Sequence, residues 1–90
     1  MKVSELIIED RMRKVIMGMD AAKRNIDSKE IVRETAFTGR GLGLDSVGLF
    51  ELVVSVEKEF DFFIEVSELG SGMFENVGTL VNYIGAKLNK

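Results

Sequence analysis

The sequence predicts an all-α fold: a small four-helix bundle of three main helices and one short helix, in a single domain over residues 1–90. Three stretches repeat apolar side chains every three or four residues, as one face of a helix does, and no convincing pair of strands accompanies them. The chain of 90 residues has room for one core, and its composition, 46% hydrophobic and 30% charged, is typical of a globular domain.

The first helix is predicted over residues 4–19. Charged residues there lie mostly away from the apolar stripe, so the helix is amphipathic. The stripe consists of Ile8, Met12, Val15, Ile16 and Met19. We expect this face to pack into the core, which explains its two methionines better than a peptide-binding groove does.

A long loop is predicted from residue 20 to residue 44. Within it, Asp27 and Glu30 have the spacing of a capping box, which would open a short turn through Glu34. The loop ends in Gly39-Arg40-Gly41-Leu42-Gly43, where three glycines allow positive φ angles and close backbone approach. This run lacks the order of either nucleotide-binding glycine motif, so we expect no nucleotide site.

The second main helix is predicted to begin after Asp45, whose side chain can cap it. Its apolar stripe consists of Leu49, Leu52, Val53, Val56 and Phe60. Val47 and Val54 fall roughly opposite this stripe on the helical wheel, so we expect both side chains to reach solvent. Isolated exposed apolar residues are normal, and the two valines fit a plain surface as well as a partner-binding patch.

The sequence of the last third of the chain predicts a connecting segment followed by a final helix. Residues 61–64 have the pattern of an extended segment with alternate side chains turned inward, and residues 66–69 are predicted to form a short helical turn. Beyond it, Asn76 can cap the last helix. The apolar face of that helix consists of Val77, Leu80, Val81, Ile84 and Leu88.

Charge is distributed unevenly along the chain. Residues 1–44 carry nine Lys/Arg against seven Asp/Glu, a net +2, whereas residues 45–90 carry three against eight, a net −5. An acidic surface repels nucleic acid and attracts basic protein partners. We therefore expect no nucleic-acid partner, although solvated helix faces explain most of these charges equally well.

The residue inventory excludes several kinds of chemistry. The chain has no His and no Cys, so it offers no Ser-His-Asp triad, no thiol nucleophile and no usual zinc site. Glu57 and Glu59 are better explained as a solvated face than as an acid–base pair. We expect no metal and no catalysis by the chain itself. The sequence has no signal-peptide pattern and no stretch of membrane-spanning length, so a cytoplasmic location is expected.

Ser46 follows the glycine-rich loop and stands in the first turn of the second main helix. The free N–H groups and positive end of a helix favour a phosphodiester at such a hydroxyl. Because the chain supplies no base to activate it, another enzyme would have to perform the modification. On position alone, however, a helix-capping role beside Asp45 is the better explanation.

Three segments at and after Ser46 form a recognisable sequence motif: Gly43-Leu44-Asp45-Ser46-Val47, Glu51-Leu52-Val53 and Glu57-Lys58-Glu59-Phe60-Asp61. Together they resemble the phosphopantetheine attachment region of the acyl carrier protein family. The resemblance continues through Phe74-Glu75-Asn76-Val77-Gly78-Thr79-Leu80 to Tyr83-Ile84. It covers nearly the whole chain and is strongest from Gly41 to Ile84.

This resemblance implies a helical bundle of the acyl-carrier type whose Ser46 receives 4'-phosphopantetheine from coenzyme A through a phosphopantetheinyl transferase. Asp45 would be the orienting neighbour. Acyl groups would ride on the arm as thioesters between fatty-acid, polyketide or related biosynthetic enzymes. The implied partners are acyl-transferring and chain-elongating enzymes with basic docking patches. We expect the carrier to be a monomer. Its implied docking surface consists of Val47, Glu51, Val54 and Glu57.

Some positions depart from the commonest fatty-acid carriers. Gly48 stands where many have an acidic residue, Lys58 interrupts the acidic run, and the loop before Ser46 is longer. These features fit a specialised carrier at least as well as a housekeeping one. A carrier of aminoacyl units remains an alternative, as does an unmodified helical adapter that binds a protein partner through the same face.

Overall fold

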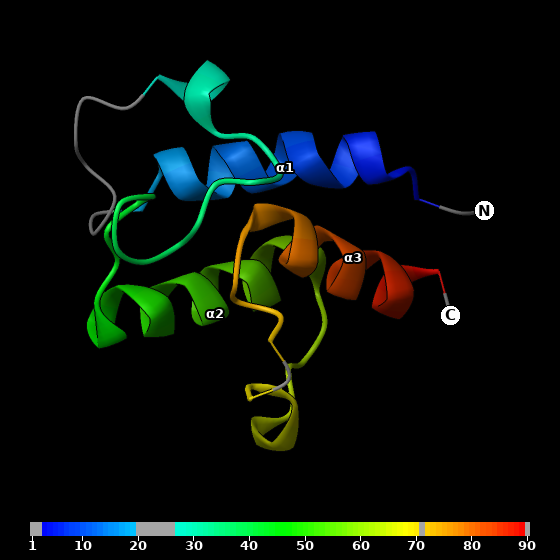
Figure 1. Ribbon diagram of the computed structural model, residues 1–90. Coiled ribbons are helices and arrows are strands. Elements are labelled where there is room, and N and C mark those ends of the chain that lie inside the picture. Colours follow the sequence, from blue (N-terminus) through cyan, green and yellow to red (C-terminus); the bar gives the residue numbers. More distant parts are fainter. Residues whose placement is uncertain (1–2, 20–26, 71, 90) are drawn as a thin grey trace.

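The computed structural model of the chain describes residues 3–19, 27–70 and 72–89. It contains three α-helices, α1 (Glu5–Met17), α2 (Ser46–Phe60) and α3 (Val77–Leu88) (Figure 1). Two short 3-10 turns accompany them, η2 (Ser28–Glu30) and η3 (Val66–Glu68). The described residues form no strand, only an isolated bridge between Ala36 and Asn76. The predicted all-helical bundle is thus confirmed.

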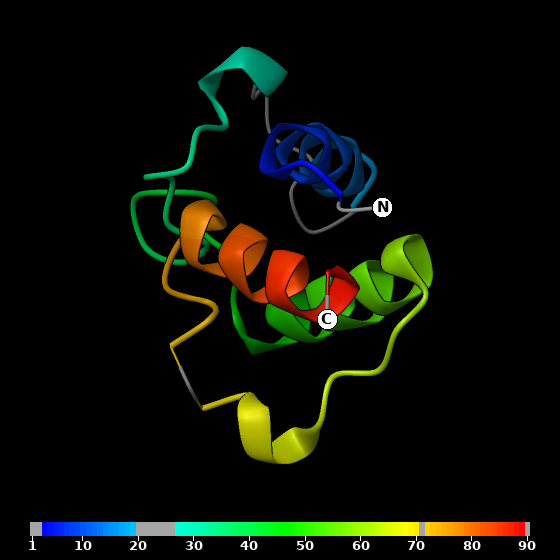
Figure 2. The ribbon, with the colours of Figure 1, turned by 90° about the vertical axis from the view of Figure 1, so that its right-hand side faces the viewer.

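The three helices bury their apolar faces in one core. Figures 1 and 2 show α1 across one side of the molecule with α2 and α3 beneath it. The helical residues that are buried from solvent include Ile8, Met12 and Ile16 of α1, Leu52, Val56 and Phe60 of α2, and Val77, Leu80, Val81 and Ile84 of α3. These positions agree with the predicted stripes, because a helix with one apolar face gains most by turning that face inward.

Side-chain caps begin each helix. Ser4 Oγ accepts from the N–H of Leu6 at 3.1 Å, and Asp45 Oδ1 accepts from the N–H of Gly48 at 2.9 Å. At α3, Asn76 and Thr79 form a reciprocal capping box at 2.9 and 3.1 Å. These bonds satisfy N–H groups that the helix itself leaves free. The predicted caps Asp45 and Asn76 are confirmed.

The turn after Asp27 is shorter than its sequence pattern predicts. Asp27 Oδ1 accepts from the N–H of Lys29 at 3.0 Å, as a cap should. The turn, however, is a 3-10 helix that ends at Glu30, and the prediction of a turn through Glu34 is wrong. The chain becomes extended at Ile31, whose side chain is buried and whose carbonyl accepts from Arg13 Nε at 2.9 Å. Burial of Ile31 thus ends the turn.

The described part of the long loop, from residue 27 to residue 45, is fastened to two helices. Arg33 donates to Glu9 of α1 at 3.2 Å and to Asn82 of α3 at 2.8 Å. The backbone adds two bonds to the start of α3, from the N–H of Val77 to the Thr35 carbonyl and from that of Gly78 to the Arg33 carbonyl. Residues 20–26 of the predicted loop lie outside the described residues. These bonds to α1 and α3 hold residues 33–35 in place, and the loop runs from there to the start of α2.

Candidate functional site

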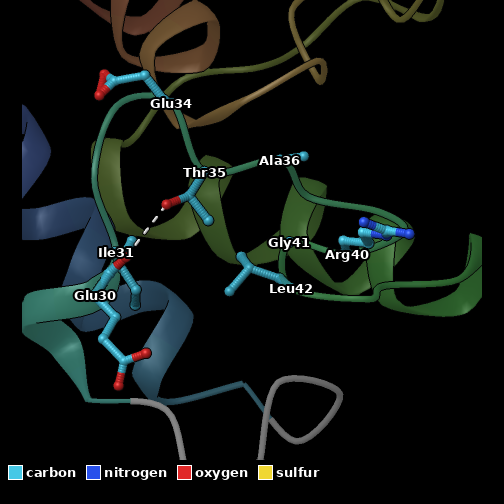
Figure 3. Close-up of a pocket in the computed structure, with 8 residues that line it drawn as sticks. All are labelled: Glu30, Ile31, Glu34, Thr35, Ala36, Arg40, Gly41 and Leu42. Atoms are coloured by element: carbon cyan, nitrogen blue, oxygen red, sulfur yellow. Dashed lines mark hydrogen bonds between the residues drawn. The ribbon is translucent and has the colours of Figure 1, made fainter.

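The glycine run before α2 folds back on itself. Gly39 and Gly43 have φ angles of 60° and 67°, the left-handed region that glycine tolerates without strain. Gly41 instead lies against the backbone of Ala36, too close for a Cβ atom. Figure 3 shows Gly41 and Leu42 beside Ala36 at one edge of a pocket of about 410 Å³. The prediction of positive φ and close approach is confirmed.

Backbone bonds and burial then fix the end of this loop. The N–H of Leu42 donates to the Ala36 carbonyl and that of Leu44 to the Phe37 carbonyl, both at 2.9 Å. The side chains of Phe37, Leu42 and Leu44 are all buried. The chain therefore leaves the core at Leu44 and begins α2 in a defined direction.

Ser46 is the first residue of α2, and its side chain is exposed. Asp45 caps the helix through its bond to the N–H of Gly48, and no residue in the described ranges hydrogen-bonds to the Ser46 hydroxyl. Capping by Asp45 thus leaves the hydroxyl free, which removes the competing explanation that Ser46 serves as a cap. A group attached here projects into solvent beside the free N–H groups of the first helical turn.

The four predicted docking residues are not equally accessible. The side chain of Val47 is 73% exposed, and that of Glu51 is half-buried. Val54 is also half-buried, so its side chain reaches solvent as predicted, but only in part. The longer side chains of Phe50 and Lys58, one turn away on either side, flank it on the helix surface.

Glu57 has a structural contact of its own. Its Oε2 accepts from the backbone N–H of Ile64 at 2.8 Å. The carboxylate is half-buried and holds the segment that follows α2. Any role of Glu57 toward a partner would therefore be combined with this bond.

An apolar groove of about 440 Å³ lies between α2 and residues 62–70, which we call the 62–70 loop. It is lined by Leu49, Phe50, Val53, Phe63, Ile64, Val66, Leu69 and Phe74. Phe50 and Phe63 are 70% and 67% exposed, so aromatic side chains form its rim. Sequence reasoning missed these two residues, although Phe50 lies one helical turn after Ser46 and could have been placed on the same face.

Within the 62–70 loop, the predicted alternation is confirmed: Phe62 and Ile64 turn inward and Phe63 turns outward. Phe62 packs against Tyr83 with ring centroids 6.2 Å apart. At η3, Glu68 forms an ion pair of 3.1 Å with Lys87 of α3. The hydrogen bond from Lys87 holds the pKa of Glu68 below its ordinary value.

The Tyr83 hydroxyl is buried and finds no hydrogen-bond partner among the described residues. Burial raises the pKa of Tyr83 to about 12 from an ordinary value of 10.0, and the neighbouring Glu68 carboxylate adds to the rise. In the unfolded chain the phenol loses its proton first. The folded state is therefore fully favoured below pH 10 and loses stability as the pH rises toward 12.

This pKa is directly testable because Tyr83 is the one tyrosine of the chain. We expect the ultraviolet absorbance of the phenolate to rise about two pH units later in the folded protein than in the urea-unfolded chain. The alkaline loss of unfolding free energy should also be smaller in Tyr83→Phe than in the wild type. A phenol that titrates at the same pH in both states would contradict the burial of this hydroxyl.

Two further observations bear on the kind of site. No group of His, Cys, Asp and Glu in the described residues is arranged to hold a metal ion. Among the same residues, no helix is long and apolar enough to cross a membrane.

Comparison with known proteins identifies the family. Residues 21–84 match the family model described as "Phosphopantetheine attachment site". The chain is 37% identical over 79 residues to the mitochondrial acyl carrier protein of Saccharomyces cerevisiae, an alignment that covers 88% of this chain and 61% of that protein. It is 39% identical over 66 residues to the acyl carrier protein of Clostridium acetobutylicum, covering 73% of this chain and 82% of that one.

The match to the family model includes the glycine-rich loop, all of α2 and most of α3. The chain spans about three fifths of the yeast relative, 61% of its length. The exposed serine at the start of α2 lies inside the matched region. The chain therefore belongs to the acyl carrier protein family: it is a carrier with a 4'-phosphopantetheine prosthetic group, and not an enzyme.

Proposed function

We propose that Ser46 is the attachment site and that the protein shuttles acyl groups between biosynthetic enzymes. The observation that carries the proposal is the exposed Ser46 hydroxyl, free of hydrogen bonds within the described residues, at the start of a helix that Asp45 already caps. The N-terminal N–H groups of α2 favour the negative phosphodiester, and Asp45 orients the turn. The bound arm supplies a terminal thiol on which cargo is held as a thioester.

The residues of α2 fit a flexible arm attached at this point. Ser46, Leu49, Phe50 and Val53 have the spacing of one helix face. The groove therefore begins about one turn, roughly 5 Å, beyond the attachment hydroxyl. An apolar chain at the end of the arm can fold back and bury surface there, and such burial contributes about 25 cal/mol per Å².

The lining of the groove favours an acyl cargo over an aminoacyl one. All eight lining residues are apolar, so an aminoacyl ammonium group would be desolvated there without a partner. We therefore propose apolar acyl units as the cargo and keep aminoacyl units as the second candidate.

Loading tests the carrier proposal against an unmodified adapter. The purified protein is incubated with coenzyme A and a broad-specificity phosphopantetheinyl transferase, and its intact mass is recorded. A carrier gains one phosphopantetheinyl group. An unchanged mass, while an active transferase control is modified, would favour the adapter.

Loading with different arms tests the cargo. We expect an octanoyl arm to shift the methyl resonances of Leu49 and Val53, whereas an alanyl arm of the same kind leaves them near their positions in the unloaded protein. Equal shifts with both arms would contradict an apolar cargo site. The methyl resonances of Ile8, on the far side of the core, provide the internal reference.

For partner docking we propose the start of α2, with Val47, Phe50 and Glu51 as its centre. Phe50 joins the set because it is exposed beside Val47, and Val54 and Glu57 stand at its edge. Basic patches on the transferase and on acyl-transferring and chain-elongating enzymes would meet its carboxylates. Weak and rapidly formed contacts of this kind suit a carrier that must leave each partner.

Charge reversal tests this surface. We expect Glu51→Lys to slow modification by the transferase roughly three- to tenfold at low salt, because charges near the surface steer association even when they are partly buried. The effect should shrink as salt shortens the Debye length to about 8 Å at physiological ionic strength. Glu75→Lys makes the same charge change at an exposed site before α3 and should have little effect. Equal slowing by both variants would refute a local docking surface.

The remaining assignments are also proposals. We propose one carrier domain over residues 1–90, a monomer, in the cytoplasm, serving fatty-acid, polyketide or related synthesis. The net −5 of residues 45–90 argues against a nucleic-acid partner. The mitochondrial relative is the reason to test location directly, by imaging the tagged protein in its own cells.

A further inference from the structure

The 62–70 loop stands apart from the three helices. Figures 1 and 2 both show η3 projecting from the bundle on the side away from α1. Within this loop, all of which the structure describes, Ile64 alone is fully buried, and Val66 is 78% exposed. The burial of apolar surface therefore contributes little to holding the outer end of the loop.

Two hydrogen-bonded side-chain contacts tie this loop to the helices within the described residues. Near its start, Glu57 accepts from the N–H of Ile64 at 2.8 Å. At its outer end, Lys87 Nζ lies 3.2 and 3.1 Å from the two carboxylate oxygens of Glu68. The side chains of Lys87 and Glu68 are only 31% and 30% exposed, and the ammonium group also lies 5.5 Å from the centre of the Tyr83 ring.

The outer contact controls one wall of the apolar groove. Phe63, Val66 and Leu69 form the wall on the loop side and face Leu49, Phe50 and Val53 of α2. Glu68 lies between Val66 and Leu69 in sequence, so its position and theirs change together. If Glu68 separates from Lys87, the outer part of the wall loses its ion pair with α3, while Phe62 still packs against Tyr83 and Glu57 still holds Ile64.

We propose that the Glu68–Lys87 ion pair is a latch that keeps the 62–70 loop closed over the apolar groove, and that its release admits an apolar ligand. The identity of that ligand, the acyl cargo, rests on the proposed function, but the latch itself does not. An ion pair at the surface is weak, which suits a latch that must open repeatedly: its loss should increase the open population about two- to fivefold.

Amide hydrogen exchange of the unmodified protein, resolved by residue, measures this opening. In Glu68→Gln and in Lys87→Gln we expect two- to fivefold faster exchange at Glu68 and Leu69, whose N–H groups donate within η3, and unchanged exchange in α1. Glu5→Gln is the matched control, because it removes an exposed ion pair with Arg33, 3.3 Å long, on the opposite side of the molecule. Salt at about 1 M should raise the exchange rates of the wild type toward those of the two variants, because it screens the ion pair.

Two results would overturn the latch. Exchange at Glu68 and Leu69 that is unchanged in both variants would show that the pair holds nothing. Equal acceleration throughout the helices would show that the pair supports the whole fold instead of this loop. A double-mutant cycle with Glu68→Lys and Lys87→Glu decides whether the two side chains act together. In the double variant, amide exchange in this loop should be slower than the combined effects of the two single substitutions predict. Strict additivity of these effects would contradict the proposal.

Access to the groove is measured with Nile red, an uncharged apolar dye on which the altered charges do not act directly. We expect its association rate to rise by the same factor as the exchange rate in Glu68→Gln and to stay unchanged in Glu5→Gln. Faster exchange without faster dye entry would mean that the loop moves without guarding the groove. Because the experiment uses protein without its arm, a failure of Ser46 loading would not affect it.

Discussion

Replacing Gly41 with alanine should destabilise the protein by about 3 kcal/mol or more, one of the larger effects that a single small substitution produces. The added Cβ atom would overlap the carbonyl oxygen of Ala36 and lie 2.6 Å from its carbonyl carbon. Both neighbours are backbone atoms, so no side chain can rotate away to make room. Relief requires moving the Ala36 carbonyl, which accepts from the N–H of Leu42.

The damage should extend to the modification site, because this loop sets the direction in which α2 begins. We expect Gly41→Ala to lower the midpoint of urea unfolding and to slow transferase modification at temperatures where the protein is still folded. Gly70→Ala is the neutral control, since nothing lies within 4 Å of the position that its new Cβ would take, and it should change stability by less than about 0.5 kcal/mol.

Gly39→Ala separates conformational strain from steric overlap. Its Cβ would also meet nothing within 4 Å, but its φ angle of 60° is unfavourable for alanine, which predicts a loss of about 1–2 kcal/mol. A Gly41→Ala protein as stable as Gly70→Ala would contradict the close backbone approach.

The features that sequence analysis predicted correctly depend on residues near one another in the chain. The stripes of the helices follow from a period of 3.6 residues, and the caps Asp45 and Asn76 bond to N–H groups three residues away. Such features require no knowledge of the rest of the fold. For the same reason, Ser46 could be placed in the first turn of α2 from sequence alone.

The features that sequence analysis missed depend on distant segments. The groove exists only because the 62–70 loop returns alongside α2, and the pair of Glu68 and Lys87 joins residues 19 positions apart. A helical wheel also treats the exposed side of a helix as uniform, so it could not show that Phe50 would be more exposed than Val54. These contacts required the tertiary structure.

Replacing Ser46 with alanine should abolish modification by the transferase. The expected loss is complete because the hydroxyl oxygen is itself the atom that forms the phosphodiester. Because Asp45 continues to cap α2, the free energy of unfolding of the variant should lie within about 0.5 kcal/mol of the wild-type value. A loss of modification therefore cannot be ascribed to misfolding. Ser67→Ala is the control, since it removes another exposed serine, and it should be modified at the wild-type rate.

The most direct test of the central claim is to locate the prosthetic group by peptide mass spectrometry of wild-type protein after incubation with coenzyme A and the transferase. We predict one phosphopantetheinyl group per chain, on the peptide that contains Ser46, with fragment ions that place the added mass on that residue. A group found on any other residue, or none at all beside an active transferase control, would contradict the assignment of Ser46.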